Sequence, residues 1–173
     1  MNKIILSLTV FFVFLFNSCV HAGSATANVK GTAADSSLKG KVFFQDTPEG
    51  LKIHAEFQGA PAGKHGFHIH DIGDCGDVGK AAGGHYNPQG VPHGLLMKDG
   101  FSHAHAGDLG NIEIAADGTG TLNTLLSGLT LKGGKYDVLG RSVILHEKED
   151  DFGQPTGNAG GRIGCGIIVD EIE

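Results

Sequence analysis

The chain has 173 residues, with 13 Lys and Arg against 19 Asp and Glu, and its formal net charge of −6 excludes a general nucleic-acid binder. Charged residues make up 18% and apolar residues 40%, a balance that excludes an intrinsically disordered chain and is typical of one globular domain. Glycine is abundant, at 29 residues, but follows no three-residue period, which excludes a collagen-like helix and predicts many turns.

Residues 1–22 have the pattern of a secretory signal peptide. A single Lys precedes a mainly apolar run over 4–16, and the segment ends in small residues before a cleavage position after Ala22. The apolar run is shorter than the about 20 residues that a membrane-spanning helix needs. We therefore predict a mature domain over 23–173. A retained anchor and lipidation of Cys19 are the two alternatives.

Removal of this leader changes both the charge and the cysteine count. Lys3 is the one charged side chain of residues 1–22, so the net charge becomes −7. Cys75 and Cys165 are the cysteines that remain. Two cysteines in an exported protein predict one disulfide.

The mature chain consists of short apolar segments separated by turn residues. Residues 51–57 alternate strictly between apolar and polar side chains, which predicts a half-buried strand, and 47–50 and 116–119 predict hairpin turns. The predicted strands are 25–32, 41–46, 51–57, 67–70, 109–115, 120–126, 141–147 and 164–169. No stretch keeps a 3.6-residue apolar spacing. We predict an all-β fold, an eight-stranded antiparallel Greek-key sandwich or barrel.

Two long segments, 71–108 and 148–163, are rich in Gly and show no pattern of regular structure. Loops of such length in a compact domain are usually functional or disordered. We therefore predict two long functional loops.

The histidines of the mature chain have the spacing of metal ligands. His68 and His70 are placed on one face of a strand, about 6.6–6.8 Å apart along the backbone. Further candidate ligands lie in or beside the loops, namely His85, His93, His105, Asp108 and His146. Imidazole suits copper and zinc, and a carboxylate is a common zinc ligand. Six His and one Asp in this distribution predict two metal sites. We expect His54 and His65 on the surface.

Along its whole mature length, and in order, the chain resembles the copper,zinc superoxide dismutases. The resemblance rests on the strings at 66–70 (GFHIH), 83–88 (GGHYNP), 93–94 (HG), 105–111 (HAGDLGN), 146–151 (HEKEDD) and 157–166 (GNAGGRIGCG). It implies a β-sandwich fold and an enzyme that converts superoxide to oxygen and hydrogen peroxide.

The resemblance also implies a role for each matching residue. Copper is expected on His68, His70, His85 and His146. Zinc is expected on His85, His93, His105 and Asp108. His85 is then a catalytic bridge between the two metals, and Asp150 links a copper ligand to a zinc ligand. Arg162 is expected beside copper as the catalytic group that attracts the substrate anion. Cys75 and Cys165 are expected to form the disulfide.

Departures from the family pattern bear on subfamily and location. Cys75 follows His70 by five residues, as in the bacterial exported members, whereas the string at 146–151 resembles the animal form. We predict the bacterial exported type, located in the periplasm of a Gram-negative bacterium and protecting the cell envelope. No nucleic acid is expected as a partner, and no stable membrane contact unless Cys19 is lipidated. A monomer and a homodimer both stay open. A non-catalytic copper and zinc carrier and an adhesion module are the alternative functions.

Overall fold

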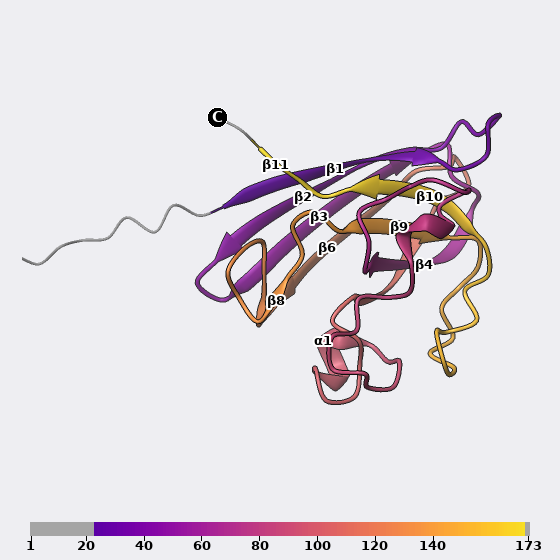
Figure 1. Ribbon diagram of the computed structural model, residues 1–173. Coiled ribbons are helices and arrows are strands. Elements are labelled where there is room, and N and C mark those ends of the chain that lie inside the picture. The colour runs from indigo at the N-terminus through magenta and orange to yellow at the C-terminus, as the bar shows by residue number, and fades with distance from the viewer. Residues whose placement is uncertain (1–22, 172–173) are drawn as a thin grey trace, which may run out of the picture.

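The computed structural model describes residues 23–171, and most of their regular structure is β-strand (Figure 1). The strands are β1 (Ser24–Gly31), β2 (Lys39–Thr47), β3 (Gly50–Gln58), β4 (Gly63–His70), β5 (Asp108–Ile114), β6 (Gly120–Leu126), β7 (Leu129–Thr130), β8 (Tyr136–Asp137), β9 (Ser142–His146), β10 (Arg162–Ile167) and β11 (Val169–Asp170). The helical elements are η1 (Lys80–Ala82) and α1 (Leu96–Asp99). No helix in this part of the chain has the length and apolarity of a membrane span. The predicted leader over 1–22, with Cys19, lies outside the described residues.

Eight of the strands close into one antiparallel barrel. They follow the order β10-β9-β4-β5-β6-β3-β2-β1, and β10 pairs again with β1, where Lys30 lies opposite Cys165. The consecutive strands β4, β5 and β6 are neighbours in the sheet, and β9 lies beside β4, which is the Greek-key order. The predicted all-β Greek-key fold is therefore confirmed, with the sheet closed as a barrel.

The alternation in β3 shows how the sequence builds the core. Leu51, Ile53, Ala55 and Phe57 are all 2% exposed or less, while the residues between them are exposed or half-buried. A Cβ on Gly40 of the neighbouring strand would lie 2.6 Å from the ring of Phe57, so this position accepts Gly alone. The core thus follows from the period-2 pattern of each strand.

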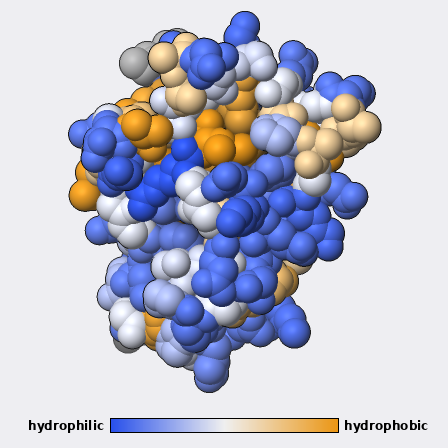
Figure 2. Space-filling view, turned by 90° about the vertical axis from the view of Figure 1, so that its right-hand side faces the viewer, coloured by the Kyte–Doolittle hydropathy of each residue, from blue (hydrophilic) through white to orange (hydrophobic). Residues whose placement is uncertain are grey.

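The two long connections lie outside the barrel on the same side of the molecule, after β4 and after β9 (Figure 1). They are joined where the main chain of His93 exchanges two hydrogen bonds with Gln154, at 3.0 and 2.8 Å. Figure 2, which faces the right-hand side of Figure 1, shows a mostly hydrophilic surface there.

The prediction that these connections contain no regular structure is wrong for η1 and α1. Each is a single turn, too short to produce a 3.6-residue pattern, and each ends at a Gly with positive φ, Gly83 and Gly100. The two-residue strands β7 and β8 were not predicted, because such short segments give no alternation.

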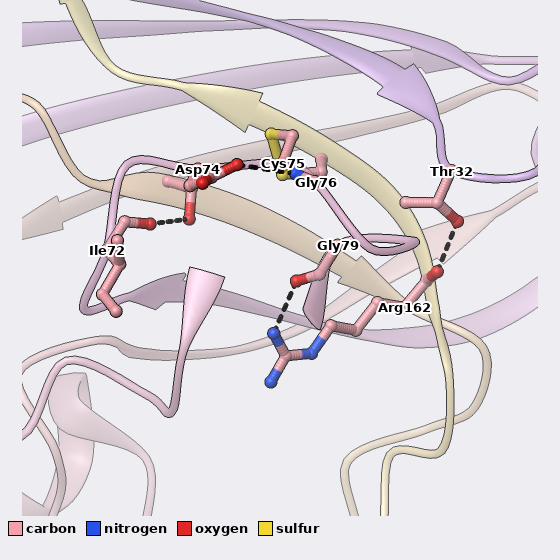
Figure 3. The surroundings of a disulfide bond; sticks show 9 residues. Thr32, Ile72, Asp74, Cys75, Gly76, Gly79 and Arg162 are labelled. Carbon is pink, nitrogen blue, oxygen red and sulfur yellow. Dashed lines mark hydrogen bonds between the residues drawn. A yellow bond between two sulfur atoms is a disulfide. The ribbon is translucent and has the colours of Figure 1, made fainter. Parts of the chain in front are cut away.

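The Cys75–Cys165 disulfide is confirmed, with a Cα–Cα distance of 5.7 Å. It fastens the first long connection to β10, three residues after Arg162 (Figure 3). The bridge therefore holds the loop against the strand that carries Arg162.

Replacing both cysteines by Ala should lower the free energy of unfolding by about 4–5 kcal/mol. The bridge joins residues that are 90 positions apart, and a cross-link over such a span removes much entropy from the unfolded chain. Urea unfolding of both proteins without metals measures the difference. A loss below about 1 kcal/mol would contradict the prediction.

Candidate metal centre

Seven side chains converge beneath the two long connections in two groups that share His85. In each group the potential ligand atoms lie within 4.8 Å of one another, and every member is buried. The first group is His68, His70, His85 and His146. The second group is His85, His93, His105 and Asp108. The structure thus brings together every residue that the sequence marked as a candidate ligand.

The barrel supplies the fixed part of the first group. His68 and His70 alternate along β4 with the buried Phe67 and Ile69, so both rings leave the strand on the side away from the core. β9 pairs with β4 and ends at His146. An isolated bridge joins the backbone of His70 to that of His85, which brings the loop ligand to the strand.

Backbone carbonyls select which ring nitrogen faces the interior of the first group. His70 donates from Nδ1 to the carbonyl of Gly83 at 3.0 Å, and Nδ1 of His146 lies 3.5 Å from the carbonyl of Gly160. The two Nε2 atoms then face each other at 3.3 Å with lone pairs and no proton between them. Two facing lone pairs are the arrangement that a shared cation would stabilise.

Asp150 determines which ring nitrogen carries the proton in one histidine of each group. His68 donates from Nε2 to Asp150 at 2.8 Å, and His93 donates from Nε2 to the same carboxylate at 3.0 Å. The buried Nδ1 atoms of both rings have no hydrogen-bond partner within residues 23–171. A buried polar atom without a partner costs free energy, so both atoms point to an absent ligand. Asp150 therefore connects His68 of the first group to His93 of the second group.

Asp108 is the centre of the second group and is completely buried. One oxygen accepts from Nδ1 of His85 at 2.8 Å and of His105 at 3.0 Å, and the other accepts from the backbone N–H of Gly94 at 3.0 Å. Nδ1 of His93 also lies 2.9 Å from the second oxygen. Three imidazoles around one carboxylate form a donor set that suits zinc.

Burial keeps the first group neutral. It lowers the pKa of His70 to about 2, of His85 to about 4 and of His146 to about 3. Burial opposes the charge of Asp108, but hydrogen bonds from His105 and His85 outweigh it and hold the pKa of that carboxyl far below its usual range. The first group thus presents uncharged nitrogens at neutral pH, and the second group contains an ionised carboxylate.

Without metals, the protein should lose stability as the pH falls from about 6.5 to about 4. The unfolded chain binds protons on His70, His85 and His146 near pH 6.5, whereas the folded chain does not until about pH 2 to 4. Each such group lowers the free energy of unfolding by about 1.4 kcal/mol per pH unit. The pKa of Asp108 lies below this pH range in the folded protein and near the lower end of the range in the unfolded chain.

His93 does not change this expectation. Burial lowers its pKa, but Asp108 and Asp150 outweigh burial and raise it to about 9, so below pH 6.5 it is protonated in both states. Urea unfolding of the metal-free protein between pH 4 and pH 8 measures the slope. Stability that is constant or increasing toward pH 5 would contradict the prediction.

Arg162 lies beside the first group, and its backbone is paired with His146. Its guanidinium donates to the carbonyls of Gly79 at 2.6 Å and Gly83 at 2.5 Å (Figure 3 draws the first of these). The carbonyl of Gly83 also accepts from His70, so one oxygen links the guanidinium to a candidate ligand. Arg162 thus contacts the first group through its pairing with His146 and through the shared carbonyl of Gly83.

The prediction that His65 lies on the surface is wrong. Its side chain is buried, with Nδ1 2.8 Å from the carbonyl of His146 and Nε2 2.9 Å from the carbonyl of Pro61. The reason is that β4 begins at Gly63 rather than at residue 67, so His65 lies within the strand. His54 is partly exposed, with its side chain one-third accessible, and His103 belongs to neither group.

Sequence analysis did not identify two residues that support the site. Asn111 holds the main chain of Asp150 through two hydrogen bonds, at 2.7 and 2.9 Å, and Gln154 holds that of His93. These bonds connect residues 39 and 61 positions apart and leave no local pattern.

Comparison with known proteins gives a match to a family model. Residues 38–168 match the family model of copper/zinc superoxide dismutase. The chain is similar to an extracellular superoxide dismutase [Cu-Zn] of Caenorhabditis elegans, with 44% identity over 140 residues that cover 77% of this chain. It is also similar to an extracellular superoxide dismutase [Cu-Zn] of Drosophila melanogaster, with 42% identity over 147 residues that cover 78% of this chain and 77% of the relative.

The matches differ in how much of each relative they cover. The similarity spans 62% of the length of the nematode protein. Among solved structures, the crystal structure of the clock protein EA4 has a TM-score of 0.75 and 31% identity, covering 86% of this chain and 94% of that chain. The fold of most of this chain therefore occurs in a solved structure.

Proposed function

Because the chain belongs to the copper/zinc superoxide dismutase family, we propose that it converts two superoxide anions and two protons to oxygen and hydrogen peroxide. The observation that carries this proposal is the pair of buried ligand groups that share His85. The position of Arg162 beside the first group supports an anionic substrate. The same arrangement without catalysis would serve a metal carrier, which has no need of the guanidinium.

The proposed copper ligands are the first group, His68, His70, His85 and His146. The proposed zinc ligands are the second group, His85, His93, His105 and Asp108. The unpartnered Nδ1 atoms of His68 and His93 and the facing Nε2 atoms of His70 and His146 support this fit. Copper when bound supplies one-electron redox chemistry, whereas zinc is redox-inert.

His85 is the proposed proton carrier. Its Nδ1 faces Asp108 and His105 of the second group, at 2.8 and 3.4 Å, which leaves Nε2 for the first group. A ring that faces two cations loses both protons more readily than one in water. In our proposal His85 would be a ligand in both groups when the metals are bound, and its Nε2 would take a proton when it leaves the first group and deliver that proton to the product peroxide. Arg162 orients the anion next to that nitrogen.

We extend the proposal to the place of action. A domain over 23–173 that follows a leader over 1–22 fits export, and the named relatives are extracellular enzymes. The bacterial exported type, the periplasm as the destination and protection of the cell envelope stay predictions. Lipidation of Cys19 stays an alternative to removal of the leader, and a monomer and a homodimer both stay open.

The direct test is the rate of superoxide dismutation by the exported protein loaded with copper and zinc, with the metal-free protein as control. We expect a high rate that disappears when copper is removed and returns when copper is added. A loaded protein that binds both metals in the two groups but does not catalyse dismutation would overturn the proposal in favour of a carrier.

A further inference from the structure

Arg141 is a largely covered cation outside both ligand groups, directly before β9. Its Nε donates to the carbonyl of Asp137 at 2.9 Å, and its Nη1 donates to the carbonyl of Asp71 at 2.8 Å and to its carboxylate at 2.7 Å. The side chain is 21% exposed. A guanidinium with three such bonds has little freedom to move.

The face of the same guanidinium covers an aromatic ring. Its Cζ lies 3.5 Å from the ring centroid of Tyr86, which is itself 4% exposed. Arginine stacks on aromatic faces through cation–π attraction and flat contact. The face of the Arg141 guanidinium therefore packs on Tyr86, while its edge donates hydrogen bonds to Asp71.

The two residues held in this way directly follow two candidate ligands. Asp71 comes after His70, at the end of β4, and Tyr86 comes after His85. The backbones on either side are already joined, because the N–H of Asp71 donates to Gly84 at 2.9 Å. Arg141 thus adds side-chain contacts to the backbone contact between the segment that follows His70 and the segment that contains His85.

We propose that Arg141 is a positioning residue of the metal centre, which fixes His85 relative to His70 by clamping Tyr86 to Asp71. This inference rests on the proposed function, since it assumes that copper binds to the first group. Residues that orient metal ligands typically change metal affinity by 10–100-fold when they are replaced. Arg141 touches no ligand itself, so we expect an effect near the lower limit.

The test compares four variants by copper affinity and by the electron paramagnetic resonance spectrum of bound Cu(II). Arg141→Lys retains the charge but loses the stack and the fork of donors, and Tyr86→Leu removes the ring. Both should weaken copper binding about 10-fold and alter the spectrum. Tyr86→Phe keeps the ring face and should behave like the wild type. Lys132→Met is the matched control, because it removes a cation and an exposed ion pair with Asp170 away from the site.

The outcomes separate this inference from the proposed function. Wild-type copper affinity and spectrum in both Arg141→Lys and Tyr86→Leu would overturn the inference, even if unfolding shows a loss of stability. An equal defect in Tyr86→Phe would also overturn it, because the ring face would then not be the element that matters. If Tyr86→Leu does not fold, the copper affinity and spectrum of Arg141→Lys test the inference. Failure of the wild type to bind copper at the first group would instead refute the proposed function.

Discussion

Replacing His146 by Ala should abolish dismutation while zinc remains bound. His146 belongs to the first ligand group alone, where its Nε2 faces that of His70 at 3.3 Å. The variant loses one of four nitrogen donors and opens a space at the end of β9, so copper should bind weakly and in an altered geometry. Since a bound metal supplies several kcal/mol of transition-state stabilisation, we expect the rate constant to fall by roughly 10³-fold or more.

Metal analysis and a reciprocal variant make this prediction specific. Asp108→Asn keeps the volume of the side chain but removes the negative charge that three imidazoles surround. It should lose zinc more readily than copper, whereas His146→Ala should show the opposite order. Loss of zinc with retention of copper in His146→Ala would mean that the ligand groups are wrongly assigned to the metals.

The fold could be predicted where the strands have a one-sided burial pattern. In β3 every second residue is buried, and the printed sequence shows that alternation without any structure. In α1 and in β7 the regular segment is four and two residues long, too short to repeat the period that would reveal it. The early start of β4 was missed because Gly63 and Lys64 interrupt the apolar pattern, and this hid the burial of His65.

For the metal centre, the sequence identified the donors but not the orientation of their rings. The spacing of His68 and His70 marks a pair on one strand face, and the resemblance assigned the other candidate ligands to the two metals. The choice of nitrogen depends on the carbonyl of Gly83 and on Asp150, which meet the rings only after the loops have folded over the barrel. Asn111 and Gln154 act through main-chain contacts, which leave no signal in the order of residues.

Reversal of the charge at Arg162 should reduce the rate constant strongly without releasing the metals. The protein is acidic, with a net charge of −7 once residues 1–22 are removed, so its overall field repels a superoxide anion. A local cation in such a field concentrates the anion at one place, and steering of this kind changes association rates by about 10–10³-fold. Arg162 is held at that place by Gly79 and Gly83, the second of which also holds His70.

Three variants at Arg162 separate charge from shape. Arg162→Lys retains the charge but cannot bond both carbonyls at once, so it should lose a part of the rate. Arg162→Met should lose more, and Arg162→Glu should lose roughly 10²-fold or more, because a carboxylate repels the substrate. Higher ionic strength should slow the wild type and accelerate Arg162→Glu, since salt screens attraction and repulsion alike over about 8 Å. Pulse radiolysis at several salt concentrations, with metal content measured in each sample, gives both rates and their slopes. Full activity of Arg162→Glu with both metals bound would show that the guanidinium does not guide the substrate, and would favour the carrier function over catalysis.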